Sequence, residues 1–300
     1  MPLPSPYAER LDAIPVRQHS LDVLGSSTSY WDYGPGNRPV DLVLVHGYRG
    51  DHHGLEPIVS ELPGLRILSP DLPGFGLSSA MTEAPHSIDG YGRWLEAFVD
   101  ATGTAGEVPM LGHSFGSIVV AHAIAAGLVV PRVILVNPIS TDPMAGVNGV
   151  LARLTRLYYR VGRALPSRAG AAWLGSPLIV RFMSGTLAKT PDPRLKRWIH
   201  EEHLRYFSGF SDRDTLAEGF DASLSTDVTR AAGALTMPTL LVVGDEDLIA
   251  PLEGQRRLDE RLPDSRLVVL SGVGHLVHYE RPAEAAVALR GFLAEGRATR

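Results

Sequence analysis

Short runs of consecutive apolar residues recur along the chain, and stretches long enough for a helix separate them. Within a run the residues do not alternate between apolar and polar, as they would in a strand with one face in water. These runs predict buried strands at residues 42–45, 66–68, 108–111, 133–136, 239–243 and 267–270. Apolar strands that alternate with helices are typical of a parallel sheet covered on both faces. We therefore expect an α/β fold with a mostly parallel, doubly wound sheet.

Two segments near the N-terminus predict an antiparallel hairpin at the edge of this sheet. They are residues 19–24 and 27–33, and the turn falls near Gly25. Apolar residues at helical spacing, with helix start signals before them, predict helices between and after the strands. The expected helices are 54–62, 87–101, 115–126, 251–261 and 282–295.

The alternation of strands and helices stops between residues 139 and 232, where several helical patterns follow one another. The clearest pattern predicts one apolar helix face, formed by Val147, Val150, Leu151, Leu154, Leu157, Tyr158, Val161 and Leu165. The opposite side of this helix carries Arg153, Arg156, Arg160 and Arg163. We expect these arginines to form a solvated face rather than to contact anionic lipid or an acidic substrate. The predicted division is a core from 1–138, a helical cap or lid from 139–232, and the rest of the core from 233–300.

Composition excludes several kinds of site. The 300 residues include no cysteine, which excludes disulfides, thiolate metal sites and cysteine nucleophiles. A net charge of −5 argues against binding to nucleic acid, because nucleic-acid-binding domains are usually clearly basic. The first 20 residues lack the apolar core of a signal peptide, and the longest apolar stretch, 118–130, is shorter than a membrane span of about 20 residues. We expect a cytoplasmic protein without an integral membrane segment; nothing in the sequence indicates its oligomeric state.

The most informative motif is Gly112-His113-Ser114-Phe115-Gly116. It follows a predicted strand and opens a predicted helix, so it predicts a tight strand-to-helix turn with the serine hydroxyl raised above the sheet. The small residues on either side permit a strained backbone at the serine. A serine is a poor nucleophile unless a base lies within hydrogen-bond reach and a third group orients that base. The chain offers an acid and then a histidine downstream of the serine. This is the order expected when the nucleophile lies on a strand-to-helix turn of this kind.

Four motifs in order resemble those of the α/β-hydrolase superfamily, in particular its serine esterases and lipases with a helical cap. They are Leu44-Val45-His46-Gly47-Tyr48, the loop from Asp71 to Ser78, the serine turn, and a final pair of loops at 244–251 and 274–282. The resemblance covers about residues 19–138 and 236–295. It implies that Ser114 is the nucleophile and that His275 is the general base.

The resemblance also implies an orienting acid, and Asp247 has the spacing that the superfamily prefers between Gly244 and Pro251. Asp245 is the next candidate and Glu246 the third. Some members carry the acid after an earlier strand, but here that position holds Asn137 and Pro138, which cannot serve, and Asp142 lies too far on.

Further roles follow from the same resemblance. The backbone N–H groups of Tyr48 and Phe115 would form the oxyanion hole, and we expect the Tyr48 side chain to be used mainly in packing. His46, Asp71 and Ser78 would brace loops rather than take part in chemistry. His278 lacks the glycine that precedes His275, so we expect it to pack beneath the loop.

Neither a metal nor an organic cofactor is expected. His52 and His53 follow Asp51, but they lack the helical i, i+4 spacing of a zinc pair, and a helix N-terminal cap is the simpler interpretation. The segment from Gly74 to Gly76 lacks the third glycine of a dinucleotide-binding loop.

The predicted function is hydrolysis of a small carboxylic ester through an acyl-enzyme, and the aromatic residues of the cap favour an apolar acyl group. A thioesterase or acyltransferase would use the same triad. So would a carbon–carbon bond hydrolase, although those enzymes usually carry tryptophan where this chain has Leu276. Serine as nucleophile disfavours epoxide hydrolase and dehalogenase relatives, for which the resemblance implies aspartate. The alternative outside the enzymes is a ligand-binding protein that has the hydrolase fold but does not turn over a substrate.

Overall fold

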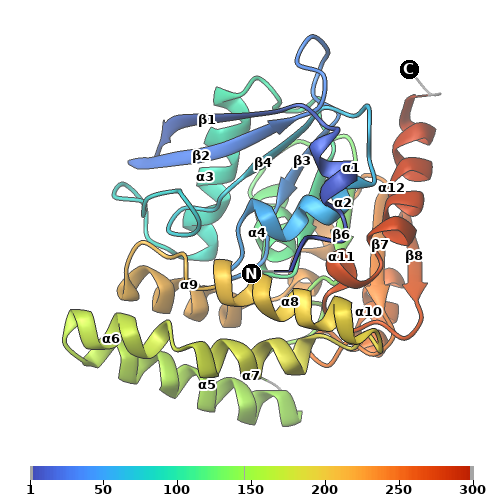
Figure 1. Ribbon diagram of the computed structural model, residues 1–300. Helices are drawn as coiled ribbons and strands as arrows, with labels where there is room; N and C mark the ends of the chain where they lie inside the picture. Colours follow the sequence, from blue (N-terminus) through green and yellow to red (C-terminus); the bar gives the residue numbers. More distant parts are fainter. Residues whose placement is uncertain (1–2, 145, 298–300) are drawn as a thin grey trace.

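The computed structural model describes residues 3–144 and 146–297, and within them one eight-stranded sheet forms the centre of the molecule (Figure 1). The strand order across the sheet is β1-β2-β4-β3-β5-β6-β7-β8. The strands are β1 (Val16–Val23), β2 (Ser26–Tyr33), β3 (Leu42–Val45), β4 (Ile67–Pro70), β5 (Met110–His113), β6 (Val133–Val136), β7 (Thr239–Gly244) and β8 (Ser265–Leu270). All neighbours from β4 to β8 are parallel, whereas β2 pairs antiparallel with both β1 and β4.

This arrangement confirms the predicted fold class and the edge hairpin. The turn between β1 and β2 has positive φ at both Leu24 (49°) and Gly25 (70°), as the right-handed twist of a two-residue hairpin demands. β3 and β6 have the predicted bounds. β5 differs, because it begins at Met110 and continues to His113, directly before the serine turn.

Helices cover both faces of the sheet, so neighbouring residues of one strand enter different cores. Val43 and Val45 of β3 pack in one apolar cluster with α3 (Ile88–Ala101), α4 (Phe115–Ala125) and α10 (Leu252–Asp259). Leu42 and Leu44 pack in the other, with α2 (Glu56–Ser60) and α12 (Pro282–Arg297). The short helices α1 (Ala8–Asp12) and α11 (Val277–Glu280) lie on this second side. Burial on both faces explains why β3 and β6 are apolar throughout.

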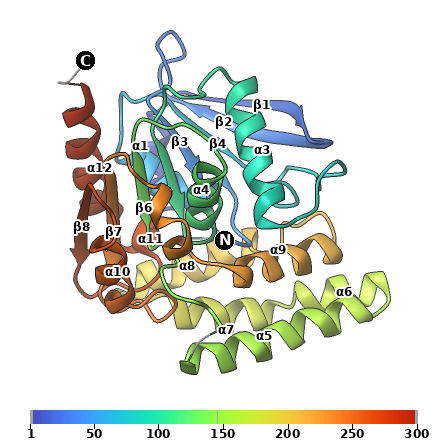
Figure 2. The same cartoon turned by 180° about the vertical axis from the view of Figure 1, so that it is seen from behind.

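Between β6 and β7 the described residues form five α-helices, two short 3-10 helices and no strand of the sheet. The α-helices are α5 (Gly146–Ala164), α6 (Ser167–Leu174), α7 (Pro177–Leu187), α8 (Pro193–Tyr206) and α9 (Arg213–Ser225). Figures 1 and 2 show all five at one end of the molecule, with α8 and α9 next to the sheet and α5, α6 and α7 beyond them. In the described part of the chain, no helix has the length and apolar character needed to cross a membrane.

Helix α5 presents its faces differently from the usual surface helix. An amphipathic helix normally directs its apolar stripe inward, but here Leu154 and Leu157 are 60% and 56% exposed. Two arginines instead face α9: the Nε of Arg156 lies 2.6 Å from Asp221 Oδ1, and the Nε of Arg163 lies 2.9 Å from Asp214 Oδ1. Arg153 and Arg160 are exposed, as expected for a solvated face, whereas Arg156 and Arg163 pair with acids of α9. The side chains of Val147, Val150 and Leu151 lie outside the described residues.

The start of α4 approaches β3 so closely that only glycine fits at position 116. A Cβ atom built on Gly116 would lie 2.2 Å from the carbonyl oxygen of Val45. Its nearest neighbours are backbone atoms, which cannot rotate away as a side chain could.

We predict that Gly116→Ala lowers the free energy of unfolding by about 3 kcal/mol, because the added methyl group overpacks a contact between two backbones. Urea denaturation would measure the loss. Gly291→Ala in α12 is the matched control: its Cβ would meet nothing within 4 Å, and removing a helix-interior glycine should stabilise the protein by about 1 kcal/mol. An equal effect of the two substitutions would contradict the close approach at Gly116.

A buried imidazole joins α7 to α8. His203 Nδ1 lies 2.7 Å from the Oγ of Ser184, and the ring stacks on Phe207. Burial, aided by nearby His200, lowers the pKa of His203 to about 3. In the unfolded chain the same group titrates near pH 6.5, so between these two values the unfolded state binds more protons than the folded state.

We therefore predict that the protein loses stability as the pH falls from about 6.5 towards 5, and that His203→Asn reduces this loss. The reduction should be about 1.4 kcal/mol per pH unit, which is the linkage term of one proton. Urea denaturation across this pH range measures the slope. Ser184→Ala keeps the buried imidazole and should keep the wild-type slope; a His203→Asn slope equal to that of the wild type would refute the prediction.

Candidate active site

Ser114 occupies the sharp turn between β5 and α4. Its φ of 51° and ψ of −116° are rare for a residue with a side chain. The turn is held because the Ser114 N–H donates to the Val136 carbonyl of β6 at 3.1 Å, and the Ser117 N–H donates to the Ser114 carbonyl at 2.9 Å. The side chain of Ser114 is half-buried. Its hydroxyl therefore stands at the carboxyl end of the strands and within reach of a ligand.

His275 lies beside this hydroxyl. It belongs to the loop between β8 and α11, and its Nε2 is 2.8 Å from Ser114 Oγ. The other ring nitrogen, Nδ1, is 2.7 Å from Oδ2 of Asp247. The structure thus brings the predicted serine, histidine and acid into one hydrogen-bonded chain, although they are separated by 161 and 28 residues along the sequence.

Asp247 is buried in the loop after β7, and its second oxygen accepts hydrogen bonds from the N–H groups of Ile249 (2.8 Å) and Ala250 (3.0 Å). Burial alone would raise the pKa of this carboxyl. The imidazole of His275 and the two N–H groups outweigh burial and hold the pKa below its ordinary value. A charged carboxylate at this position keeps the proton of His275 on Nδ1 and leaves Nε2 free to accept one.

The alternative acids are placed elsewhere. Asp245 accepts hydrogen bonds from the Ser271 hydroxyl (2.8 Å) and the Gly272 N–H (2.7 Å), which lower its pKa. Glu246 is exposed, and Asp142 pairs with Arg230 at 3.9 Å. Among these candidates Asp247 is the one in contact with the His275 ring.

Asn137 is part of the site, although the sequence indicated only that it cannot supply the orienting acid. It follows β6 with a positive φ of 44°, and its Nδ2 donates to Asp247 Oδ2 (2.9 Å) and to the Gly274 carbonyl (3.2 Å). One amide therefore ties the acid loop to the histidine loop. The signal in the sequence was its place directly after a buried strand, since asparagine tolerates positive φ better than most residues.

Tyr48 and Phe115 lie on the two segments that flank the serine. Phe115 is the first residue of α4, and the loop that carries Tyr48 approaches closely, because a Cβ on Gly47 would lie 3.2 Å from Ser114 Cβ. The Tyr48 hydroxyl donates to the Leu216 carbonyl at 2.7 Å, and its ring packs against aromatic neighbours. The side chain is thus used in packing, as expected.

Arg49, next in the chain, was not anticipated. It has a positive φ of 63° and is 1% exposed. Its guanidinium donates to the carbonyls of Phe207 (2.9 Å) and Leu174 (2.9 Å) and to the hydroxyl of Tyr159 (3.2 Å). A single side chain from the loop after β3 therefore anchors α5, α6 and the end of α8. Nothing in the sequence distinguishes this arginine from an exposed one.

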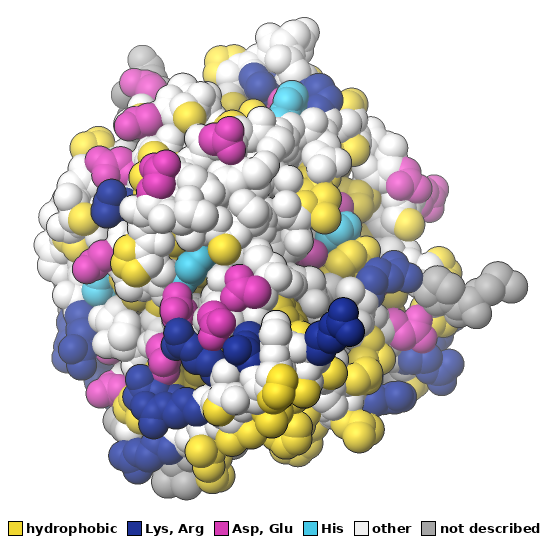
Figure 3. Space-filling model, turned by 90° about the vertical axis from the view of Figure 1, so that its left-hand side faces the viewer, with side chains coloured by type: hydrophobic (Ala, Val, Ile, Leu, Met, Phe, Trp, Pro, Cys, Tyr) yellow, Lys and Arg dark blue, Asp and Glu magenta, His cyan; other side chains and the backbone are white. Residues whose placement is uncertain are grey.

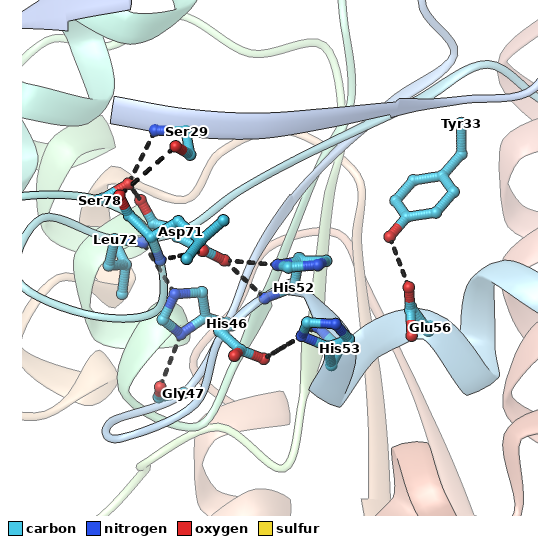
Figure 4. Close-up of polar contacts among 12 residues, drawn as sticks. Ser29, Tyr33, His46, Gly47, His52, His53, Glu56, Asp71, Leu72 and Ser78 are labelled. Atoms are coloured by element: carbon cyan, nitrogen blue, oxygen red, sulfur yellow. Dashed lines mark hydrogen bonds and ion pairs between the residues drawn. The ribbon is translucent and has the colours of Figure 1, made fainter. Parts of the chain in front are cut away.

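The expected bracing role of His46 and Asp71 is visible in Figure 4. The Leu72 N–H donates to His46 Nε2 (2.8 Å), so the ring proton is on Nδ1, which lies 2.8 Å from the Gly47 carbonyl. Asp71 accepts from the N–H groups of His52 (2.8 Å) and Leu77 (2.8 Å), and the Ser78 hydroxyl donates to the Asp71 carbonyl (2.7 Å).

Asp51, His52 and His53 lie close enough to share a cation, with one donor atom of each within 4.8 Å of the others. The Asp51 carboxylate and the Nδ1 atoms of both rings already have hydrogen-bond partners, and Figure 4 shows those of His52 and His53. Asp51 Oδ1 caps the following helical turn by accepting from the His53 N–H at 3.0 Å, and His52 Nδ1 lies 2.9 Å from Asp71 Oδ1. The ring of His52 also stacks on Trp31 and contacts the tilted ring of His53. The cluster is explained by capping and stacking, and we assign it no metal.

His278 is buried, as expected, and it packs against His113 of the serine turn. Its ring centre is 4.0 Å from that of His113, and both rings are buried. Burial lowers the pKa of His113 to about 3 and that of His278 well below its ordinary value. Both imidazoles are neutral at neutral pH, and neither is hydrogen-bonded to Ser114 among the described contacts.

A groove of about 1210 Å³ lies at the opposite end of the sheet, where the parallel strands begin. Its lining includes Arg17 and Arg66, but both are paired with Asp32 at 3.0 Å. The groove carries no group of the serine site.

Comparison with known proteins places the site in a family. Residues 42–282 match the family model described as alpha/beta hydrolase fold. The chain is 28% identical to pimeloyl-acyl-carrier-protein methyl ester esterase of Aromatoleum aromaticum, over 84% of this chain and 96% of that protein. It is 25% identical to epoxide hydrolase A of Mycobacterium tuberculosis, over 91% of this chain and 96% of the relative.

Among solved structures, a thermophilic esterase from Thermogutta terrifontis superposes with a TM-score of 0.74 at 22% identity, covering 93% of this chain and 99% of that one. This similarity shows the fold. Because the family model spans most of the sequence and includes the serine, acid and histidine loops, the chain belongs to the α/β-hydrolase fold family and is a hydrolase.

Proposed function

We propose that this protein is a serine hydrolase that cleaves a carboxylic ester with an apolar acyl group through an acyl-enzyme. The observation that carries the proposal is the hydrogen-bonded chain from Ser114 Oγ to His275 (2.8 Å) and from His275 to Asp247 (2.7 Å). Such a chain meets the requirement of a serine nucleophile for a base and of that base for an orienting acid. The similarity to a methyl ester esterase supports an ester as the substrate.

In the first half of the reaction, Ser114 Oγ attacks the ester carbonyl while His275 Nε2 takes its proton. The imidazolium that forms is stabilised by Asp247, which stays ionised because the N–H groups of Ile249 and Ala250 and the amide of Asn137 hold its oxygens. His275 then returns the proton to the leaving alcohol, and the acyl group remains on the serine.

The carbonyl oxygen becomes an anion during this step. The N–H groups of Tyr48 and Phe115 are our proposed donors to it, and Phe115 also begins α4, whose positive end favours negative charge. In the second half, His275 activates a water molecule, which attacks the acyl carbonyl and releases the acid.

We further propose that α5–α9 act as a cap over this reaction. Aromatic rings from both sides meet next to the serine turn: Tyr48 contacts Phe115 of the core as well as Tyr159 of α5 and Phe220 of α9. Phe115 and Tyr159 are buried in this cluster, so the surroundings of the serine turn are apolar, and they favour an apolar acyl group as the ligand. An epoxide is disfavoured as substrate because the resemblance implies an aspartate nucleophile for epoxide hydrolases, and this chain has Ser114.

We predict that a fluorophosphonate labels Ser114 stoichiometrically and that Ser114→Ala abolishes both the label and the burst and turnover of p-nitrophenyl esters. The acyl preference should become clear from esters of increasing chain length measured beside thioester and vinylogous diketone substrates. If the protein turned over a thioester or a vinylogous diketone faster than the esters, that compound class would replace the ester as the proposed substrate. Retained turnover by a folded Ser114→Ala protein would refute the nucleophile, and an unlabelled wild-type protein would indicate a binding protein.

We also predict that Asp247→Asn lowers kcat by about 10⁴, because a neutral amide no longer holds the productive tautomer of His275. Asp245→Asn is a matched control from the same loop, since its carboxylate contacts Ser271 and Gly272 instead of the ring. It should retain nearly full kcat. The opposite ranking of the two variants would show that the acid is misassigned.

A further inference from the structure

An exposed apolar patch covers the helices farthest from the sheet. Six large apolar side chains of the described residues are exposed there: Leu154, Leu157, Val161, Trp173, Leu178 and Phe182. Leu178 and Phe182 are 79% and 72% exposed, so most of each residue is in contact with water. Large apolar side chains gathered in this way mark an interaction surface, whereas single ones do not.

The six side chains lie on three helices, which Figures 1 and 2 show together at the end of the molecule farthest from the sheet. Leu154, Leu157 and Val161 are three and four residues apart on α5, and Leu178 and Phe182 are four apart on α7, so each set shares a helix face. Trp173 of α6 is fastened to α5, because its Nε1 donates to the Tyr158 carbonyl (3.3 Å) and the Tyr158 hydroxyl donates to the Trp173 carbonyl (2.9 Å). Figure 3 shows hydrophobic side chains gathered along this lower edge of the molecule, with lysine and arginine side chains around them.

The charge of this region is opposite to that of the whole chain. Residues 143–191 contain six arginines and one lysine but no aspartate or glutamate, in a protein with a net charge of −5. Arg156 and Arg163 pair with α9. The other four arginines, Arg153, Arg160, Arg168 and Arg181, are exposed, and among the described residues none of them has a carboxylate within salt-bridge distance.

Three of these four arginines border the apolar patch. Arg153 and Arg160 are four and three residues from Leu157, and Arg181 is three residues from Leu178, so each is a neighbour of a patch residue on its helix. The surface therefore combines an apolar centre with a positive rim. It fits a partner that is negative at its surface and apolar just beneath, and that is the composition of an anionic lipid bilayer. A second copy of this chain fits poorly, because a symmetric contact would set the same arginines against one another.

We propose that α5, α6 and α7 dock this protein on the surface of an anionic lipid bilayer. The apolar side chains enter the interface, Trp173 lies at the headgroup level, and the four unpaired arginines lie against lipid phosphates. The docking uses no residue of the serine site, so it stands or falls separately from the proposed ester hydrolysis.

The test is flotation of the full-length protein with vesicles of phosphatidylcholine alone and of phosphatidylcholine mixed with phosphatidylglycerol. We expect binding to the mixed vesicles that weakens as salt is added, and a blue shift of tryptophan fluorescence that Trp173→Phe removes. The double variant Leu178→Ser/Phe182→Ser should bind at least about tenfold more weakly, because it loses two buried apolar side chains. Arg160→Gln/Arg181→Gln should lose much of the salt dependence.

Two controls keep the test specific. Val287→Ser removes an apolar side chain of α12 that is 64% exposed and remote from the patch, and it should bind like the wild type. Ser114→Ala should also bind like the wild type, and the patch variants should still hydrolyse a short, water-soluble ester. No binding to mixed vesicles, or equal weakening by Val287→Ser, would overturn the proposal. So would a dimer, detected by light scattering, that Leu178→Ser/Phe182→Ser dissociates.

Discussion

The site depends on one steric constraint, which is the contact between the start of α4 and the end of β3. Gly116 lies so near the Val45 carbonyl that no side chain fits, and this approach leaves room for the tight turn with positive φ at Ser114 two residues earlier. The strain at the serine is tolerated because β6 and α4 fix the residues around it through backbone hydrogen bonds. The same turn raises the hydroxyl above the sheet and sets the N-terminus of α4 beside it.

Parallel strands supply the rest of the geometry. The carboxyl ends of β5, β6, β7 and β8 are neighbours in the sheet, so the loops that follow them meet although they are far apart in the sequence. Each loop contributes one group: Ser114, Asn137, Asp247 and His275. The carboxylate of Asp247 is buried, and a buried charge persists only where hydrogen bonds compensate for its lost hydration. Four donors do so here, from Asn137, Ile249, Ala250 and His275.

The helices between β6 and β7 are fastened to the core by polar contacts as well as by apolar packing. The buried guanidinium of Arg49 satisfies carbonyls at the ends of two helices, and the surface pairs of Arg156 and Arg163 join α5 to α9. Because these contacts and the buried Tyr159 set the rotation of α5, part of its apolar stripe remains directed away from the protein. The same anchoring thus leaves the apolar patch exposed.

The sequence by itself determined the fold class, the positions of most strands, and the order of serine, acid and histidine. Apolar runs, glycine spacing and strand–turn–helix order are local properties, and local sterics decide them. It also favoured Asp247 over Asp245, but only through resemblance, since both are aspartates in one loop. The tertiary structure separated them: Asp245 faces Ser271, whereas Asp247 meets the ring of His275.

Only the tertiary structure decided the roles of Asn137 and Arg49 and the direction of the α5 apolar face. An amide or a guanidinium has no periodic signature, and its role depends on which distant carbonyl or carboxylate lies within about 3 Å of it. A helix with both an apolar stripe and an arginine stripe can turn either face towards the rest of the protein. The sequence pattern does not say whether its apolar face packs in the core or binds a partner. Long-range contacts made that choice, because the acids of α9 attract the arginines and Arg49 holds Tyr159.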